Sequence, residues 1–111
     1  MSEKRIGKIK KASFGKGGYQ DAQIGVSFDL GSDKEAWGVG DFWGAWATER
    51  STHCKWTDAE RVTHLGEMVM RLNKTLEQAK VEKVEELRGK PVEVTFDGNT
   101  LKEWRVLTEA I

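Results

Sequence analysis

The 111-residue sequence has one cysteine, one proline, no net charge and no long apolar run. A single cysteine cannot form an intramolecular disulfide, which favours a reducing compartment. No stretch approaches the ~18 apolar residues that a membrane-spanning helix needs. The charged start MSEKRIGKIKK has no apolar run behind it, which argues against a secretory signal. We therefore expect a cytoplasmic protein without a membrane partner.

The 18 basic and 18 acidic residues cancel. Proteins that mainly neutralise phosphate are strongly basic as a rule, so the balance argues against long, salt-driven coating of nucleic acid. The first sixteen residues nevertheless contain only one acidic side chain, Glu3. Their basic side chains are Lys4, Arg5, Lys8, Lys10, Lys11 and Lys16. A local basic strip is therefore expected at the start of the chain.

Catalytic and metal-binding signatures are missing as well. His53, Cys54 and His64 do not have the spacing of a zinc site. The stretch GVGDFWG departs from the dinucleotide fingerprint G-x-G-x-x-G at Trp43, and GKGG lacks the spacing of a P-loop. No pair of acidic residues shows a pattern that indicates acid–base catalysis. We therefore expect a non-enzymatic protein without metal or cofactor.

The length predicts a single domain, residues 1–111, with one modest core. Residues 21–30, DAQIGVSFDL, alternate apolar and polar side chains strictly, which predicts a strand with one buried face.

Residues 5–14 also predict a strand, although Ile9 is out of phase with Ala12 and Phe14. A β-bulge between them would restore the phase. The glycine-rich residues 15–18 are expected to close a hairpin with the following strand.

The middle of the chain predicts a helix that begins with the capping box TDAE, Thr57 to Glu60. Apolar residues then recur at spacings of three and four, which places them on one helical stripe over roughly 20 residues. They are Val62, Leu65, Val69, Leu72, Leu76 and Ala79. His64 borders this stripe and is expected to pack at its edge.

The last third predicts a helical turn in 81–89, ended by Gly89, and strands over 91–96 and 101–111 joined by a turn at 97–99. The expected order is three strands, a helix and two strands. This order is typical of an α+β, mostly β fold with one long helix. The five strands could form an OB-like Greek-key barrel or an open, curved antiparallel sheet, and both architectures remain open.

The stretch WGVGDFWGAW, within the third expected strand at 37–47, combines large aromatic rings with glycine. Alternation places Trp37 and Trp43 on one face of this strand, and Phe42 and Trp46 on the other. The second face also carries Gly38, Gly40 and Gly44. Two interpretations follow: the glycines allow tight curvature within a core, or they leave bare backbone on which a planar ligand stacks.

Four segments, FGKGGYQDAQIGVSFDL, WGVGDFWG, KWTDAERVTHLG and VEELRGKPVEVTFDGNTLKEWRVLTEAI, resemble a family of small, largely uncharacterised proteins encoded by tailed bacteriophages and prophages. The resemblance covers nearly the whole chain. It implies a bacterial host cytoplasm and work in phage replication, recombination or defeat of host defences. The family has no established catalytic motif, so the resemblance assigns no site residue.

The first functional hypothesis is therefore a phage module that binds single-stranded nucleic acid or a nucleotide. Phe42 and Trp46, with Tyr19, are expected to stack on a base. The residues expected to meet phosphates are Lys8, Lys10, Lys11 and Lys16. The alternative is a counter-defence protein that inhibits a host protein complex through the same aromatic patch, which would also suit a homodimer seam.

Overall fold

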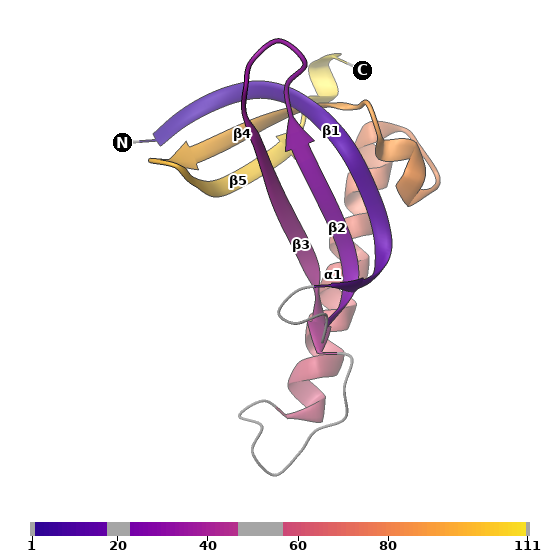
Figure 1. Cartoon of the computed structure of the whole chain (residues 1–111). Coiled ribbons are helices and arrows are strands. Elements are labelled where there is room, and N and C mark those ends of the chain that lie inside the picture. The colour runs from indigo at the N-terminus through magenta and orange to yellow at the C-terminus, as the bar shows by residue number, and fades with distance from the viewer. Residues whose placement is uncertain (1, 18–22, 47–56, 111) are drawn as a thin grey trace.

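The structure is a computed structural model of the chain, and it describes residues 2–17, 23–46 and 57–110. The elements in chain order are β1 (Ser2–Gly17), β2 (Gln23–Gly31), β3 (Gly38–Trp46), α1 (Asp58–Ala79), the 3-10 helix η2 (Val84–Leu87), β4 (Pro91–Asp97), β5 (Thr100–Val106) and the 3-10 helix η3 (Thr108–Ala110) (Figure 1). The expected order of strands and helix is confirmed. None of the helices in the described ranges is long and apolar enough to cross a membrane.

All five strands belong to one antiparallel sheet with the order β3-β2-β1-β4-β5. The fourth strand returns through α1 to lie beside the first, which is a Greek-key arrangement. The second half of β1 pairs with β2 and its first half pairs with β4, so this long strand bends through the middle of the sheet (Figure 1). Strands β3 and β5 do not pair, and the sheet is therefore open rather than a closed barrel.

The β-bulge expected in β1 is present. The register against β2 shifts between Ile9 and Lys11, and the shift leaves both Ile9 and Ala12 buried on the face that forms the core. The prediction of a loop at 15–18 is wrong for residues 15–17, because these residues belong to β1 and Gly15 and Gly17 still pair with β2. The alternation of side chains continues through these glycines, so the ladder extends further than glycine content alone suggests.

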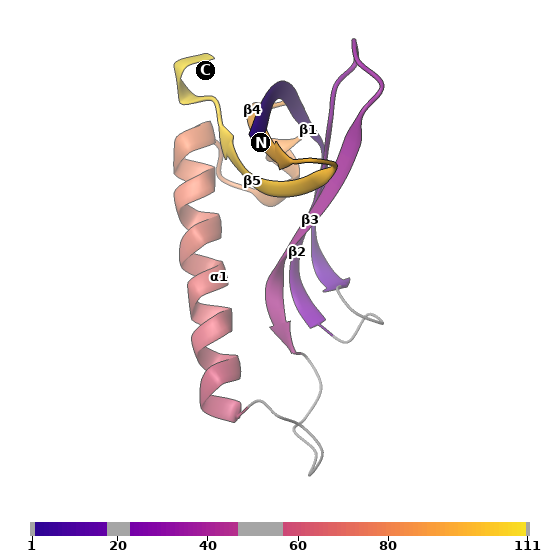
Figure 2. The ribbon, with the colours of Figure 1, turned by 90° about the vertical axis from the view of Figure 1, so that its left-hand side faces the viewer.

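Helix α1 begins as predicted, with the Thr57 hydroxyl accepting a hydrogen bond from the Glu60 backbone N–H at 3.1 Å. It ends at Lys80, which has left-handed backbone angles. The helix lies on one side of the sheet and packs against β3 and β5 (Figure 2). We call this side the inner face, and the opposite side of β1, β2 and β3 the outer face.

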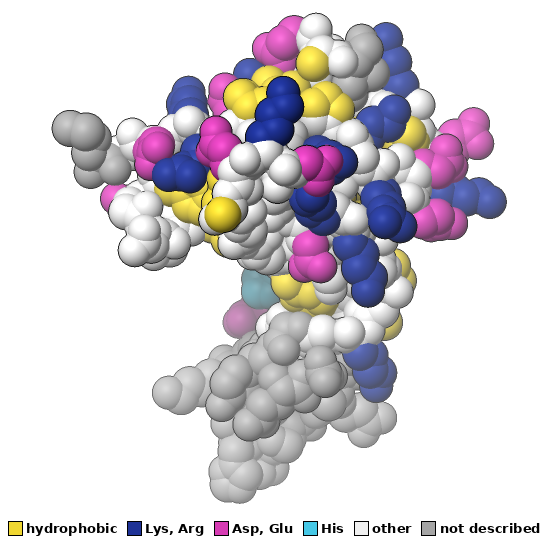
Figure 3. Space-filling view, turned by 45° about the horizontal axis from the view of Figure 1, so that its top comes forward, with side chains coloured by type: hydrophobic (Ala, Val, Ile, Leu, Met, Phe, Trp, Pro, Cys, Tyr) yellow, Lys and Arg dark blue, Asp and Glu magenta, His cyan; other side chains and the backbone are white. Residues whose placement is uncertain are grey.

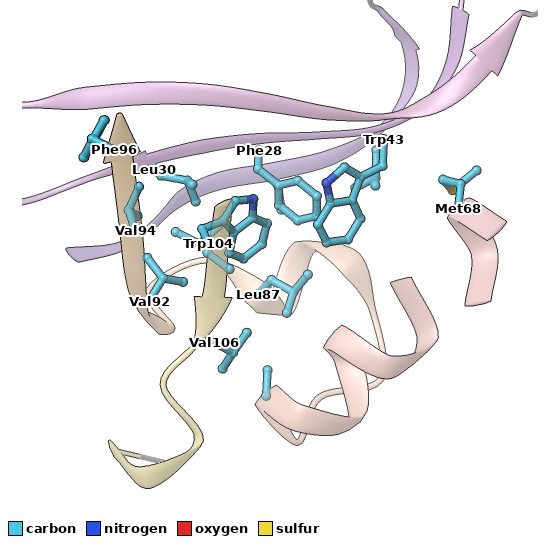
Figure 4. Packing of buried hydrophobic residues seen from close by; sticks show 14 residues of the cluster. Phe28, Leu30, Trp43, Met68, Leu87, Val92, Val94, Phe96, Trp104 and Val106 are labelled. Atoms are coloured by element: carbon cyan, nitrogen blue, oxygen red, sulfur yellow. The ribbon is translucent and has the colours of Figure 1, made fainter. Parts of the chain in front are cut away.

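The core fills the space between the inner face, α1 and η2. Figure 4 shows the rings of Phe28, Trp43 and Trp104 meeting at its centre, with Leu87 of η2 below them. Val92, Val94, Phe96, Trp104 and Val106 are buried together, as the alternation in β4 and β5 predicted. Gly89 has the positive φ angle (88°) that its expected role as a stop requires. The expected turn at 97–99 lies between β4 and β5, and Gly98 has a φ of 66° there.

The apolar stripe predicted on α1 coincides only in part with the buried side of the helix. The buried residues are Met68, Thr75 and Ala79, whereas Val62 and Val69 are exposed. Burial of Thr75 is tolerated because its hydroxyl donates a hydrogen bond to the Arg71 carbonyl at 2.9 Å. The sheet thus covers a face of α1 rotated away from the stripe that is most regular in the sequence.

Candidate functional site

The outer face is built from cross-strand rows of side chains. Ser13, Ser27 and Phe42 form one row across β1, β2 and β3, and Gly15, Gly25 and Gly44 form the next. The second row has no side chain at any position, so the aromatic ring of Phe42 stands beside bare backbone. This is the arrangement that one of the two sequence interpretations required.

The Phe42 ring lies over Gly44 of β3 and Gly17 of β1. A Cβ atom added to Gly44 would come within 2.7 Å of Phe42 Cε1, and one added to Gly17 would come within 2.9 Å of Phe42 Cε2. A side chain at either glycine would therefore push the ring away. The ring spans from β3 across to β1 while remaining half-buried, so it covers the sheet and still presents aromatic surface.

Three of the four predicted lysines are brought together on this face. The bulge places Lys10 and Lys11 between the inward-facing Ile9 and Ala12, so both lysines point to the outer face. Lys8 pairs in register with Gly31 and lies on the same side as they do. Figure 3 shows dark blue Lys and Arg side chains gathered on this side of the molecule, with Asp and Glu side chains between them.

The carboxylate of Asp33 holds two of these lysines. Lys8 and Lys10 both form ion pairs with it, and their hydrogen bonds, that of Lys10 first, lower the pKa of the Asp33 carboxyl from 3.8 to about 2. Two ammonium groups share one carboxylate, so the cluster keeps a net positive charge. Lys11 is exposed and forms no ion pair with any described residue.

Lys16 is not part of this group. It pairs in register with Ile24 and follows the phase of Ala12 and Phe14, which places it on the inner side of β1. The sequence misplaced it because the bulge inverts the alternation between Lys10 and Lys16. Tyr19 and the side chain of Trp46 lie outside the described part of the chain, and the stacking role predicted for them stays a prediction.

A groove of about 370 Å³ continues from Phe42 along the free edge of β3 toward α1. Its lining includes His64 and Arg71 of α1, and the Arg71 guanidinium lies 4.0 Å from the ring centroid of Trp43. Arg71 is exposed and has no ion-pair partner in the described ranges. Sequence reasoning missed Arg71, because no local motif relates it to a strand far away in the chain.

The tryptophans of the inner face have a structural role. Trp43 and Trp104 stack with a centroid distance of 5.3 Å and an interplanar angle of 15°. One oxygen of Asp41 accepts hydrogen bonds from both indole N–H groups, at 2.8 Å from Trp43 and 2.7 Å from Trp104. Asp41 thereby joins the unpaired strands β3 and β5 through side chains.

Trp37 lies at the other end of the open edge, before β3 begins. Its ring stands edge-on to Phe96 with 5.6 Å between the centroids, and it would clash with any side chain at Gly7. A cavity of about 310 Å³ beside it contains both Glu3 and Arg5. These two form an ion pair at 3.3 Å, so this cavity presents no excess charge to a ligand.

The described ranges hold no group of three or more His, Cys, Asp and Glu side chains that could bind a metal ion. His64 was expected to pack at the edge of the apolar stripe, but it is exposed at the rim of the groove. His53 and Cys54 lie outside the described residues.

Comparison with known proteins adds no assignment. No protein-family model matches the chain, and neither a curated protein nor a solved structure matches it significantly.

Proposed function

We propose that the outer face of β1, β2 and β3 binds a short segment of single-stranded nucleic acid without catalysing a reaction. The observation that carries the proposal is the bulge in β1, which turns Lys10 and Lys11 to the face where Phe42 lies on glycine. Base stacking on an exposed aromatic ring stabilises single-strand complexes without requiring base-specific contacts.

The spacing of these groups suits a nucleotide strand. In the observed registers, Phe42 and Lys11 are separated by two strand spacings across the sheet and by two residues along the strand direction. With strands ~4.8 Å apart and a rise of ~3.4 Å per residue, their Cα atoms are about 12 Å apart. A base on Phe42 therefore leaves room for the neighbouring phosphate to reach the lysines.

The groove beside β3 extends the site in the other direction. Phe42 lines both the outer face and this groove, whose lining also holds Glu67 and Arg71 of α1. The Arg71 guanidinium lies over the ring of Trp43. We place one phosphate near Lys11 and a second near Arg71, with the stacked base between them.

The acidic residues on this face limit the affinity. Asp29 is exposed and lies directly across from Lys11 in the strand pairing. Asp33 forms ion pairs with Lys8 and Lys10. Few phosphates are therefore neutralised, and the expected complex is short, weak and moderately dependent on salt. A host-cytoplasm role in phage replication or recombination follows from the sequence resemblance and belongs to the same proposal.

The test is fluorescence anisotropy of a labelled oligothymidylate of about twelve nucleotides, titrated with protein at several salt concentrations. Phe42→Leu keeps an apolar cover on the glycines but removes the aromatic face, and we expect binding ~5- to 100-fold weaker. Lys11→Ala should reduce the slope of log K against log salt by about one.

Lys102→Ala is the matched control, because Lys102 is an exposed lysine on β5, away from the outer face. It should bind like the wild type. Absence of binding by the folded wild type at low salt contradicts the proposal, as does a Phe42→Leu variant of unchanged affinity. Replacing the oligonucleotide with thymidine monophosphate distinguishes a strand site from a single-nucleotide site.

A further inference from the structure

One side of α1 carries no charged side chain from Ala59 to Asn73. Glu77 ends this stretch, because its carboxylate accepts a hydrogen bond from the Asn73 side-chain amide at 3.3 Å. We call the uncharged side the neutral face: it consists of Ala59, Val62, Thr63, Gly66, Val69, Met70 and Asn73, all of them exposed. The acidic and basic residues between Asp58 and Lys74 lie elsewhere around the helix. Solvent-facing helix surfaces are normally charged, so an uncharged one of this length is unusual.

The exposed surface of the neutral face is largely apolar. The exposed fractions of Val62, Val69 and Met70 are 66%, 57% and 75%. The Thr63 hydroxyl donates a hydrogen bond to the Ala59 carbonyl at 2.9 Å, which turns the polar atom back to its own helix. Three large apolar side chains therefore face water with little polar surface between them.

The spacing on this face is that of a helix–helix seam. Ala59, Gly66 and Asn73 repeat at seven-residue intervals, and Val62 and Val69 repeat at the same interval between them. A seven-residue repeat keeps one stripe directed at a neighbouring helix. An added Cβ atom at Gly66 would meet nothing within 4 Å, so a second backbone can approach closely there.

We propose that two copies of this chain associate through their neutral faces, with the α1 helices crossing near Gly66. The charge distribution selects a second copy as the occupant. A neutral surface meets its own two-fold image without repulsion between like charges, whereas a strongly charged partner would find no counter-charge on it. The formal net charge of zero likewise removes the long-range repulsion between copies.

The size of the seam sets the strength of the dimer. Fifteen residues, 59–73, span about 21 Å of helix at ~1.5 Å per residue. Such a seam buries a few hundred Å² per copy, less than the ~800 Å² of a standard stable interface. The dimer is therefore weak and concentration-dependent. It leaves the outer face free, because α1 lies on the opposite side of the sheet (Figure 2).

The first test is sedimentation equilibrium of the full chain from about 10 µM to about 1 mM. The wild type should rise from the monomer mass of 12.5 kDa toward twice that value. Val69→Glu places two carboxylates in the seam and should raise the dissociation constant at least ~10-fold. Gln78→Glu adds the same charge to another exposed side of α1 and should leave the dissociation constant unchanged.

The second test locates the contact. Gly66→Cys in a Cys54→Ser background leaves a single thiol, and mild oxidation at high concentration should link two copies through it. Gln78→Cys in the same background is the control for random collision. Faster disulfide formation at position 66 supports the crossing point. Equal rates, a monomeric wild type at every concentration, or a dimer that survives Val69→Glu would each overturn the proposal.

Discussion

The two faces of β3 use aromatic rings in opposite ways. On the inner face, Trp43 is buried, stacks on Trp104 and donates its N–H to Asp41. On the outer face, one residue away, Phe42 has no ring partner among the described residues and lies on glycine backbone instead. The inner ring is held by directional contacts, and the outer ring is held by the shape of the sheet beneath it.

This difference separates stability from binding. The Trp43 ring links β3 to β5, which do not pair through their backbones, so its loss should lower the free energy of unfolding. The outer ring is half-buried rather than enclosed in the core, so under the proposed function its loss should weaken binding more than it weakens the fold. Three pairs of substitutions test the comparison at the level of folding and charge.

The largest effect is expected from Asp41→Ala on the inner face. The change leaves the N–H groups of Trp43 and Trp104 without their acceptor in a partly buried site. Each such unpaired donor costs ~1–3 kcal/mol, so for the two donors we expect a loss of about 2–6 kcal/mol in the free energy of unfolding. Urea denaturation followed by tryptophan emission measures it.

Asp29→Ala is the matched change on the outer face, because Asp29 is an exposed aspartate on β2. Its effect on the free energy of unfolding should stay within ~0.5 kcal/mol. If the two variants were equally stable, the link between β3 and β5 would not depend on Asp41.

An intermediate effect is expected in the row of Gly15, Gly25 and Gly44 beside Phe42. Gly15 and Gly25 face each other in register, but an added Cβ at Gly25 would lie 1.9 Å from the Trp43 carbonyl oxygen, and one at Gly15 would meet nothing within 4 Å. Gly25→Ala must therefore shift backbone and should cost about 1–3 kcal/mol. Gly15→Ala should be nearly neutral, and thermal melting of both variants gives the comparison directly.

The smallest effect concerns the charge cluster of the outer face. Lys10 and Lys8 lower the pKa of Asp33 from 3.8 to about 2, so its ionised form is favoured in the folded protein. The resulting stabilisation is complete above about pH 4 and is lost as the pH falls toward 2. An NMR titration of the Asp33 carboxyl should give a midpoint near 2.

Lys10→Ala should move this midpoint back toward 3.8, whereas Lys11→Ala, the neighbouring lysine of the bulge, should leave it in place. A midpoint that responds equally to both substitutions would mean that the pKa reflects the general field of the basic strip. In that case Asp33 would not hold two particular lysines.

Much of the fold could be predicted from local patterns. The alternation in β2, β4 and β5 predicted which of their residues are buried, and the broken phase between Ile9 and Ala12 indicated the bulge. The Thr57 cap, the stop at Gly89 and the turn at 97–99 could also be predicted, because each depends on the chemistry of one to four neighbouring residues. Local constraints of this kind act before any tertiary contact forms.

The candidate site was only partly predictable. Phe42, Lys8, Lys10 and Lys11 lie on one face of the sheet, but which face of β1 coincides with which face of β3 follows from the strand pairing and not from local patterns. Lys16 fell on the other face, because a single inserted residue reverses every later position. Arg71 could not be found at all, because its position over Trp43 depends on how α1 docks.

Local sequence patterns predicted where the strands and the helix lie and which residues each strand can bury. The tertiary packing leaves the sheet open and lets Asp41 join Trp43 to Trp104 across 63 positions of the chain. It also decided that α1 buries Met68 and leaves Val62 and Val69 to solvent. The physical reason is that periodicity limits the faces an element can bury, whereas the choice among them depends on the shape and partners that the rest of the chain presents.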